Sequence, residues 1–356
     1  MRKNLITNQR SSNIELLRIL AAIGVIVLHY NNTSIGGALG AVADGSASAI
    51  FLYFLEALFI CAVDLFVMIL GYFQSRKQSM NISKPTLLVL QVSIVSLVSF
   101  LLKQIIHAKV PSVKALFSAC LPVNHFIAIY CTVLILSPYL NLLWNHLNAK
   151  RRQIFIAILL FLFSLHPTVL SLMGKVGFDL DSMSTISNTG SNNGYSLVNY
   201  ILMYFLGAMA NNVSLGKKSI LLFFACQLPL FALEVISGAL DINVRMRAYC
   251  NPLVIGCAFF ALLSFKDLNI GSRRWINDFA GGSFMVYLTH KRLFPLFHIG
   301  EAVERGFGSL IGNLLLTCVI CYLAGWILHK LYTFLLKPFT LWFGEKTKGL
   351  VIDTGK

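Results

Sequence analysis

The first apolar segment of the sequence carries two ionisable side chains that could do chemistry inside a membrane. Arg18 and His29 stand in the stretch ELLRILAAIGVIVLHYNN at 15–32, where most neighbours are aliphatic. In a helix, a spacing of eleven residues places them within about 20° of one face and about 16 Å apart along the axis. If Arg18 lies at a membrane edge, His29 lies near the middle of a hydrocarbon core about 30 Å thick. An imidazole there could take a proton from a hydroxyl group, as a general base does.

Both side chains belong to one stripe of this predicted helix. Spacings of three and four residues place six residues on the same face: Glu15, Arg18, Ala22, Val25, His29 and Asn32. Ionisable residues inside a span are costly and by default mark functional sites. The alternative is structural, with His29 bonded to a backbone carbonyl and Arg18 extended towards the lipid headgroups.

Two acidic residues, Glu56 and Asp64, stand in the second apolar segment. Asp64 lies at a predicted depth of about 13 Å, comparable with that of His29. Its carboxylate could therefore orient the imidazole and offset the cost of the charged ring. The alternative is that Asp64 only neutralises Arg18 or another cation.

Two cations, Arg76 and Lys77, follow this segment. Together with Arg18 they could bind the phosphates of a donor that approaches from the cytoplasm. They could equally be markers of the cytoplasmic side of the membrane. Far along the chain, His290 is a further cavity candidate, because three consecutive polar residues at 290–292 cover about 200° of helix and cannot all face lipid.

Composition shows which kind of element must position these residues. Of the 356 residues, 57% are hydrophobic and 12% are charged, whereas about 25% are charged in an ordinary globular chain. The sequence therefore predicts an all-α integral membrane protein. The formal net charge of +15 does not indicate nucleic-acid binding, because Lys and Arg gather in short loops between apolar runs. The eight cysteines mostly fall inside apolar runs without metal-ligand spacing, so we expect buried side chains and no metal.

About 20 apolar residues cross a membrane as a helix, and the sequence predicts a polytopic bundle of about ten such spans. We expect them at 14–32, 49–73, 86–107, 124–144, 153–173, 197–211, 219–238, 250–266, 281–298 and 309–336. The basic loops fall on one side, which predicts that both termini are cytoplasmic. The predicted organisation is a transmembrane domain at 1–340 and a cytoplasmic tail at 341–356.

Four stretches of the sequence occur in an order that is typical of a known family. NIELLRILAAIGVIVLHY at 13–30 contains Arg18 and His29 with ten residues between them, and AVDLFVMILGYFQSRK follows at 62–77. NHFIAIYCTVLILSPYLNLL at 124–143 contains Ser-Pro, and FMVYLTHKRLF at 284–294 contains Tyr-Leu-x-His. Together these stretches resemble the membrane acyltransferase-3 family, whose members include O-acetyltransferases of surface polysaccharides.

The resemblance implies acetyl-coenzyme A as a cytoplasmic acyl donor and a carbohydrate hydroxyl as acceptor. His29 corresponds to the catalytic base, Arg18 to its paired motif residue and Asp64 to the acidic residue of the second span. The base could act on the hydroxyl directly or assist a short-lived acyl-enzyme. The implied donor-binding residues are Arg18, Arg76 and Lys77, and further cavity candidates are Glu15, Glu56, Tyr72 and His290.

The resemblance also implies a location and partners. We expect a multi-pass protein of the bacterial cytoplasmic membrane, whose partners are the lipid bilayer, the carbohydrate acceptor and polysaccharide-assembly proteins. Some family members carry a fused esterase-like domain, and we expect this chain to act without one. Leu70 replaces the Ser that precedes Gly-Tyr in the family, and Ser79 replaces the second Arg of its R-x-x-R pattern. A transporter, flippase or polymerase of lipid-linked saccharides is the alternative function.

Overall fold

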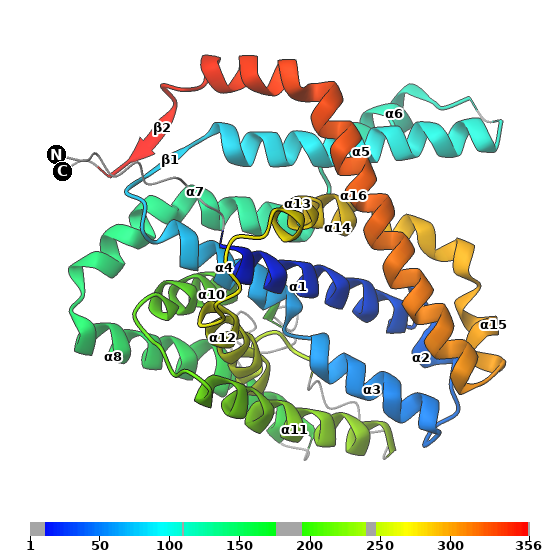
Figure 1. The fold of residues 1–356 in the computed structure, drawn as a ribbon, viewed down its shortest axis with the longest axis horizontal. Helices are drawn as coiled ribbons and strands as arrows, with labels where there is room; N and C mark the ends of the chain where they lie inside the picture. The colour runs from blue at the N-terminus through cyan, green and yellow to red at the C-terminus, as the bar shows by residue number, and fades with distance from the viewer. Residues whose placement is uncertain (1–10, 109, 176–193, 240–246, 355–356) are drawn as a thin grey trace. The chain divides into compact units, whose positions relative to one another are not determined.

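The computed structural model describes the chain except for residues 1–10, 109, 176–193, 240–246 and 355–356 (Figure 1). The described residues are mostly helical and form two compact units. The first unit comprises Met1–Ile69, Val213–Ala239 and Gly256–Lys330, and the second comprises Leu70–Asn212, Leu240–Ile255 and Leu331–Lys356.

The elements follow one another from the N-terminus as labelled in Figure 1. They are α1 (Ser12–Asn31), α2 (Ala38–Ala41), α3 (Ala47–Phe59), α4 (Ala62–Gln74), β1 (Ser79–Asn81), α5 (Ser83–Ile106), α6 (Val113–Cys120), α7 (His125–His146), α8 (Ala149–Leu160), a π-helical turn (Phe161–Leu165), α9 (His166–Lys175), α10 (Leu197–Ala210), α11 (Lys218–Ala239), α12 (Pro252–Lys266), α13 (Arg274–Gly281), α14 (Ser283–Leu293), the 3-10 helix η3 (Phe294–Phe297), α15 (Ile299–Glu304), α16 (Phe307–Lys346) and β2 (Val351–Asp353).

Seven helical stretches of the described chain are long and apolar enough to cross a membrane. They are Ser12–Asn31, Ala47–Gln74, Ser83–Ile106, His125–His146, Ala149–Met173, Lys218–Ser237 and Phe307–Lys346. Two further apolar helices, Leu197–Ala210 and Pro252–Lys266, are shorter. This pattern confirms a helical protein with several membrane spans.

The predicted total of about ten spans is not supported. The segment expected at 281–298 forms α14, which has 11 residues, and then the short η3. Eleven residues rise only about 16 Å, about half of a hydrocarbon core. The composition of this segment therefore predicted a helix correctly but not the length of that helix.

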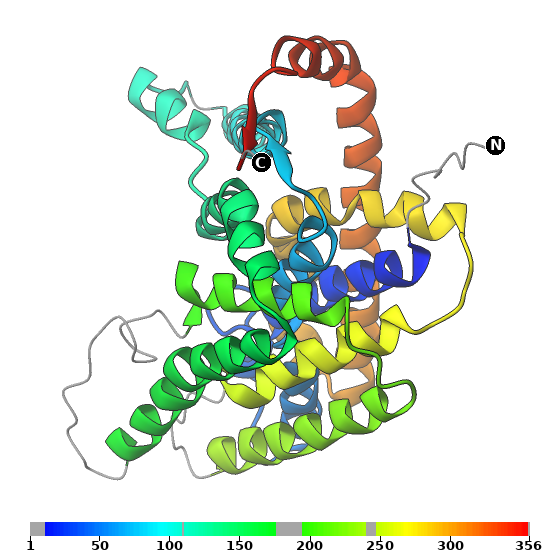
Figure 2. The same ribbon diagram turned by 90° about the vertical axis from the view of Figure 1, so that its left-hand side faces the viewer.

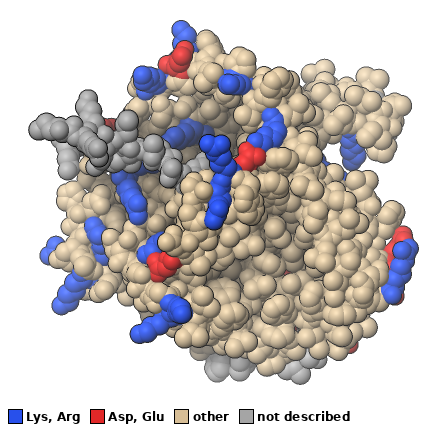
Figure 3. Space-filling model, viewed as in Figure 1, with Lys and Arg blue, Asp and Glu red and all other residues tan. Residues whose placement is uncertain are grey.

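The surface agrees with a lipid environment. Large apolar side chains are exposed along α5 and α16, including Ile105, Ile106 and Phe334. On the face drawn in Figure 3, the Lys, Arg, Asp and Glu side chains are separated by wide uncharged areas. Such a surface is unfavourable in water but is matched by lipid tails.

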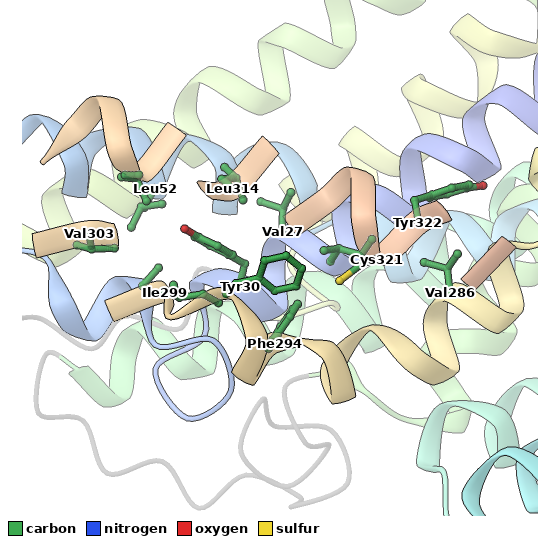
Figure 4. Close-up of a cluster of buried hydrophobic side chains, with 14 of the residues drawn as sticks. Val27, Tyr30, Leu52, Val286, Phe294, Ile299, Val303, Leu314, Cys321 and Tyr322 are labelled. Atoms are coloured by element: carbon green, nitrogen blue, oxygen red, sulfur yellow. The ribbon is translucent and has the colours of Figure 1, made fainter. Parts of the chain in front are cut away.

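In the first unit, α1 packs against α3, α13 and α14. The Ser12 hydroxyl ties the start of α1 to the start of α13, because it donates to Oδ1 of Asn277 at 2.8 Å and accepts from the backbone N–H of Arg273 at 2.8 Å. Further along α1, Val27 and Tyr30 belong to an apolar cluster with residues of α3, α14, η3, α15 and α16 (Figure 4). These contacts hold α1 in place on both sides of His29.

In the second unit, a close helix contact and a short β-ribbon stand out. A Cβ atom on Gly71 would lie 2.1 Å from the carbonyl oxygen of Tyr204, so α4 and α10 approach as closely as backbones allow. β1 and β2 lie side by side (Figure 2). They pair in antiparallel register, with Met80 opposite Ile352. The expected boundary after residue 340 falls inside α16, which continues to Lys346.

Helices α14 and α16 of the first unit meet at Gly325. A Cβ atom there would lie 2.6 Å from both Cα and Cγ2 of Val286. We therefore expect Gly325→Ala to lower the free energy of unfolding by about 1–3 kcal/mol, as overpacking does, and thermal unfolding of the purified protein in detergent measures this. Gly308→Ala is the matched control, because nothing lies within 4 Å of its added Cβ. Equal melting temperatures for the two variants would contradict a backbone contact at Gly325.

Candidate active site

The centre of the candidate site is a pair of imidazole rings from α1 and α14. Nδ1 of His29 lies 2.9 Å from Nε2 of His290, and the ring centroids are 5.0 Å apart. The His290 side chain is fully buried, whereas the His29 side chain is partly exposed. The structure thus brings together two predicted candidates that are 261 positions apart.

The hydrogen bonds determine which ring nitrogens carry protons. Nδ1 of His290 lies 2.9 Å from the backbone carbonyl oxygen of Val286. Because a carbonyl can only accept, this Nδ1 carries the proton, and Nε2 of the neutral His290 ring is an acceptor. Nδ1 of His29 must then donate to it, which leaves Nε2 of His29 unprotonated. An unprotonated Nε2 is the state in which His29 can accept a proton from a substrate.

The His290 ring and the backbone of both histidines make further contacts. Phe294 lies edge-on to the ring of His290, with centroids 5.8 Å apart, and the Cys321 thiol donates weakly to the His290 carbonyl at 3.9 Å. The carbonyl of His29 accepts a 2.9 Å hydrogen bond from the backbone N–H of Gly36, where the chain turns back after α1. The pair is therefore positioned by helix packing as well as by its own hydrogen bond.

Arg18 lies earlier on the same helix and pairs with Glu15. Its Nη1 lies 3.2 Å and 2.9 Å from the two carboxylate oxygens of Glu15. The side chain of Glu15 is 5% exposed and that of Arg18 is 28% exposed. The predicted stripe thus contains an ion pair in which the guanidinium is the more accessible partner.

The predicted contact between Asp64 and His29 is not formed. Asp64 is fully buried in α4, and neither of its carboxyl oxygens has a hydrogen-bond partner among the described residues. The position beside His29 is taken by His290, which a depth comparison along the first two segments could not reveal. Glu56, the other acidic candidate, is also buried.

Arg76, Lys77 and Tyr72 belong to the second unit. The Arg76 guanidinium lies over the Tyr72 ring, 5.2 Å from its centroid, and donates to the Asn211 side chain. Lys77 donates to Oε1 of Gln74 at 3.1 Å. Partial burial and the nearby Lys84 cation lower the pKa of Lys77. Both cationic side chains are exposed, so anions can reach them.

A second polar connection, at the end of α1, was not predicted from the sequence. The Tyr30 hydroxyl donates to Oδ1 of Asn313 at 3.0 Å, and the Asn313 amide donates to the carbonyl of Phe297 at 2.8 Å. The signal was present in the sequence, because Asn313 is a polar residue within an otherwise apolar segment. Its partner could not be read from one sequence, since Tyr30 is 283 positions away.

Comparison with known protein families identifies the chain. The model of the acyltransferase domain Acyl_transf_3 matches residues 11–330, a range that includes all the candidate residues above. The chain belongs to this acyltransferase family. Family membership and the apolar helices together make it a multi-pass membrane acyltransferase. Neither the curated proteins nor the solved structures provide a match to this acyltransferase.

The histidine pair predicts that His290 sets the reactivity of His29 in this acyltransferase. We expect His290→Ala to lower kcat by about 10²-fold or more, within the range of a general-base contribution. His290→Gln should restore part of the rate, because its Oε1 can accept from Nδ1 of His29.

A second measurement, besides kcat, is the tautomer of His29. NMR of isotope-labelled histidine in the purified protein reports it. It should change in His290→Ala and return towards the wild-type state in His290→Gln. Melting temperatures establish that both variants fold. A wild-type rate and an unchanged His29 signal in His290→Ala would overturn the assignment.

Proposed function

We propose that this membrane acyltransferase moves an acetyl group from cytoplasmic acetyl-coenzyme A to a hydroxyl of a cell-surface or exported polysaccharide, or of its lipid-linked precursor. The proposed location is the bacterial cytoplasmic membrane. The observation that carries the proposal is the hydrogen bond from Nδ1 of His29 to Nε2 of His290, since it leaves Nε2 of His29 ready to act as a base. The acetyl donor and the carbohydrate acceptor rest on the family resemblance.

The proposed reaction is a direct transfer. Nε2 of His29 takes the proton of the acceptor hydroxyl while the oxygen attacks the thioester carbonyl carbon. The new C–O bond forms and the C–S bond breaks, so that the coenzyme leaves as a thiolate. The proton on His29 then passes to that sulfur, which gives the ester and the free thiol and restores the base.

We propose that Arg76 and Lys77 of the second unit hold phosphates of the donor. The family resemblance also assigns donor binding to Arg18. Guanidinium groups bind phosphate through charge-assisted hydrogen bonds, which are stronger than neutral ones. Arg76 is exposed and is oriented by Tyr72 and Asn211. An oriented side chain loses less conformational freedom when it binds an anion.

The first test removes the proposed base. His29→Ala, assayed in membranes with radiolabelled acetyl-coenzyme A, should lose about 10²–10⁴-fold in acetyl transfer. Mass spectrometry of surface polysaccharide from cells with and without the protein identifies the polymer that gains acetyl groups. Polysaccharide that is acetylated as before in His29→Ala cells would contradict the role of His29. A transporter would instead move saccharide without consuming the thioester.

The second test separates donor binding from chemistry. We expect Arg76→Gln to raise the KM for acetyl-coenzyme A by about tenfold, the worth of one charge-assisted hydrogen bond. The KM for S-acetyl-N-acetylcysteamine, a thioester without phosphates, should not change. Steady-state kinetics with both donors gives the comparison, and Arg151→Gln, a cation of α8 outside the proposed site, is the control. An equal rise for both thioesters would argue against phosphate binding by Arg76.

A further inference from the structure

A second feature of the first unit is a cavity of about 410 Å³ formed by η3, α15 and the first turns of α16. Its polar walls carry His298, Glu301, Arg305 and Asn313. Phe297 and Leu316 provide apolar surface on the same walls. The cavity is open, and none of these polar residues was predicted as a site residue.

The charged groups of the cavity form a short exposed chain. Nδ1 of His298 lies 3.4 Å from Oε1 of Glu301, and Nη2 of Arg305 lies 3.2 Å from Oε2. The three side chains are 59–71% exposed, and ion pairs at that exposure contribute little to stability. Their hydrogen-bonding groups are therefore available to a ligand without a large loss of folding energy.

Two physical links connect this cavity with the histidine pair. The wall residue Asn313 accepts from the hydroxyl of Tyr30, the neighbour of His29 on α1, and donates to the carbonyl of the wall residue Phe297. Along the chain, η3 leads directly from the end of α14, which carries His290, to His298. That path rises roughly 14 Å at the pitch of an α-helix and a 3-10 helix.

His298 joins η3 to α15 in an unusual backbone conformation. His298 has φ 47° and ψ 51°, the left-handed conformation, between η3 and α15. A residue other than glycine seldom adopts this conformation, and such positions gather at functional sites. Here it allows η3 and α15 to follow one another with a single residue between them.

We propose that this cavity is an acceptor subsite, which binds sugar residues of the saccharide acceptor beyond the one that reacts at His29. The inference rests on the proposed function and assigns the place where the acceptor is held. A carboxylate accepts hydrogen bonds from sugar hydroxyls, the guanidinium and amide groups donate to them, and the exposed Leu316 offers apolar surface to a ring face. The Glu301 carboxylate repels an anionic ligand, and the Arg305 guanidinium is already paired with that carboxylate. The cavity therefore fits an uncharged, hydroxyl-rich ligand better than a phosphate.

Two pairs of variants test this subsite. Gly312 lines the cavity, and an added Cβ meets nothing within 4 Å, so Gly312→Leu should extend a side chain from the cavity wall. Gly308→Leu adds the same side chain to the same helix at another open position outside the cavity wall. Glu301→Gln removes a carboxylate of the cavity, and Glu304→Gln removes the charge of the other acidic residue of α15, which is exposed and does not line the cavity.

The acceptor in the assay is surface polysaccharide from host cells that lack the protein, freed of acetyl groups with mild base and cut into oligosaccharides. Protein in nanodiscs is assayed with acetyl-coenzyme A. We expect Gly312→Leu and Glu301→Gln to raise the acceptor KM by about tenfold. Both should keep the kcat at saturating acceptor and the KM for acetyl-coenzyme A, and the two control variants should match the wild type.

The outcomes separate this inference from the proposed function. Wild-type protein that transfers acetyl groups, together with cavity variants whose acceptor KM is unchanged, would overturn the subsite alone. Wild-type protein that transfers no acetyl group to these oligosaccharides would overturn the proposed function and, with it, the subsite. Melting temperatures equal to the wild type in all four variants exclude unfolding as the cause of a raised KM.

Discussion

The hydrogen bond between His29 and His290 is the interaction on which the candidate site depends. It joins α1 and α14, and it assigns opposite roles to two chemically identical rings. The Val286 carbonyl fixes the proton of His290, His290 in turn fixes the proton of His29, and one ring nitrogen of His29 is left as a base. In many enzymes a carboxylate orients such an imidazole, whereas here a neutral ring bonded to backbone does so. A neutral partner avoids placing an unpaired charge in the apolar interior of a membrane protein.

Contacts on either side hold the two histidines in position. Ser12 ties the start of α1 to the start of α13, and Gly325 allows α16 to lie directly against α14 at Val286. Near the other end of α1, the Tyr30 hydroxyl reaches Asn313 of α16 within the apolar cluster. A hydrogen bond of 2.9 Å between two side chains tolerates little displacement. The inferred tautomer of His29 therefore requires that these contacts hold α1 and α14 in place.

The first unit also combines two kinds of polar group that serve different ends. His290 is buried and His29 is partly exposed, and both lie among apolar neighbours, where hydrogen-bond geometry sets reactivity. The side chains of His298, Glu301 and Arg305 are exposed to solvent, which screens their charges. A ligand can replace the water around them at little cost in folding energy. Hydrogen bonds from Tyr30 through Asn313 to Phe297 connect the helix that carries His29 with the wall of the exposed cavity. In the proposed reaction this arrangement would separate recognition of the acceptor from the proton transfer.

The sequence by itself determined the class of protein, the helical course of the first segment and the identity of its polar residues. Apolar runs predict membrane helices from composition alone, and a spacing of three and four residues places Glu15, Arg18 and His29 on one stripe. The motifs at 13–30 and 62–77 also indicated the family, which the match over 11–330 confirmed. These properties depend on neighbours along the chain, so one sequence suffices to read them.

Only the tertiary structure decided which polar residues meet. Depth along two neighbouring spans favoured Asp64 as the partner of His29, but helix packing brought His290 there and left Asp64 buried elsewhere in the first unit. The same packing made the segment after 281 a short helix and placed Asn313 beside Tyr30. Such pairings join positions more than 250 residues apart, and their choice depends on the shapes of whole helix surfaces. No local pattern of residue types encodes that information.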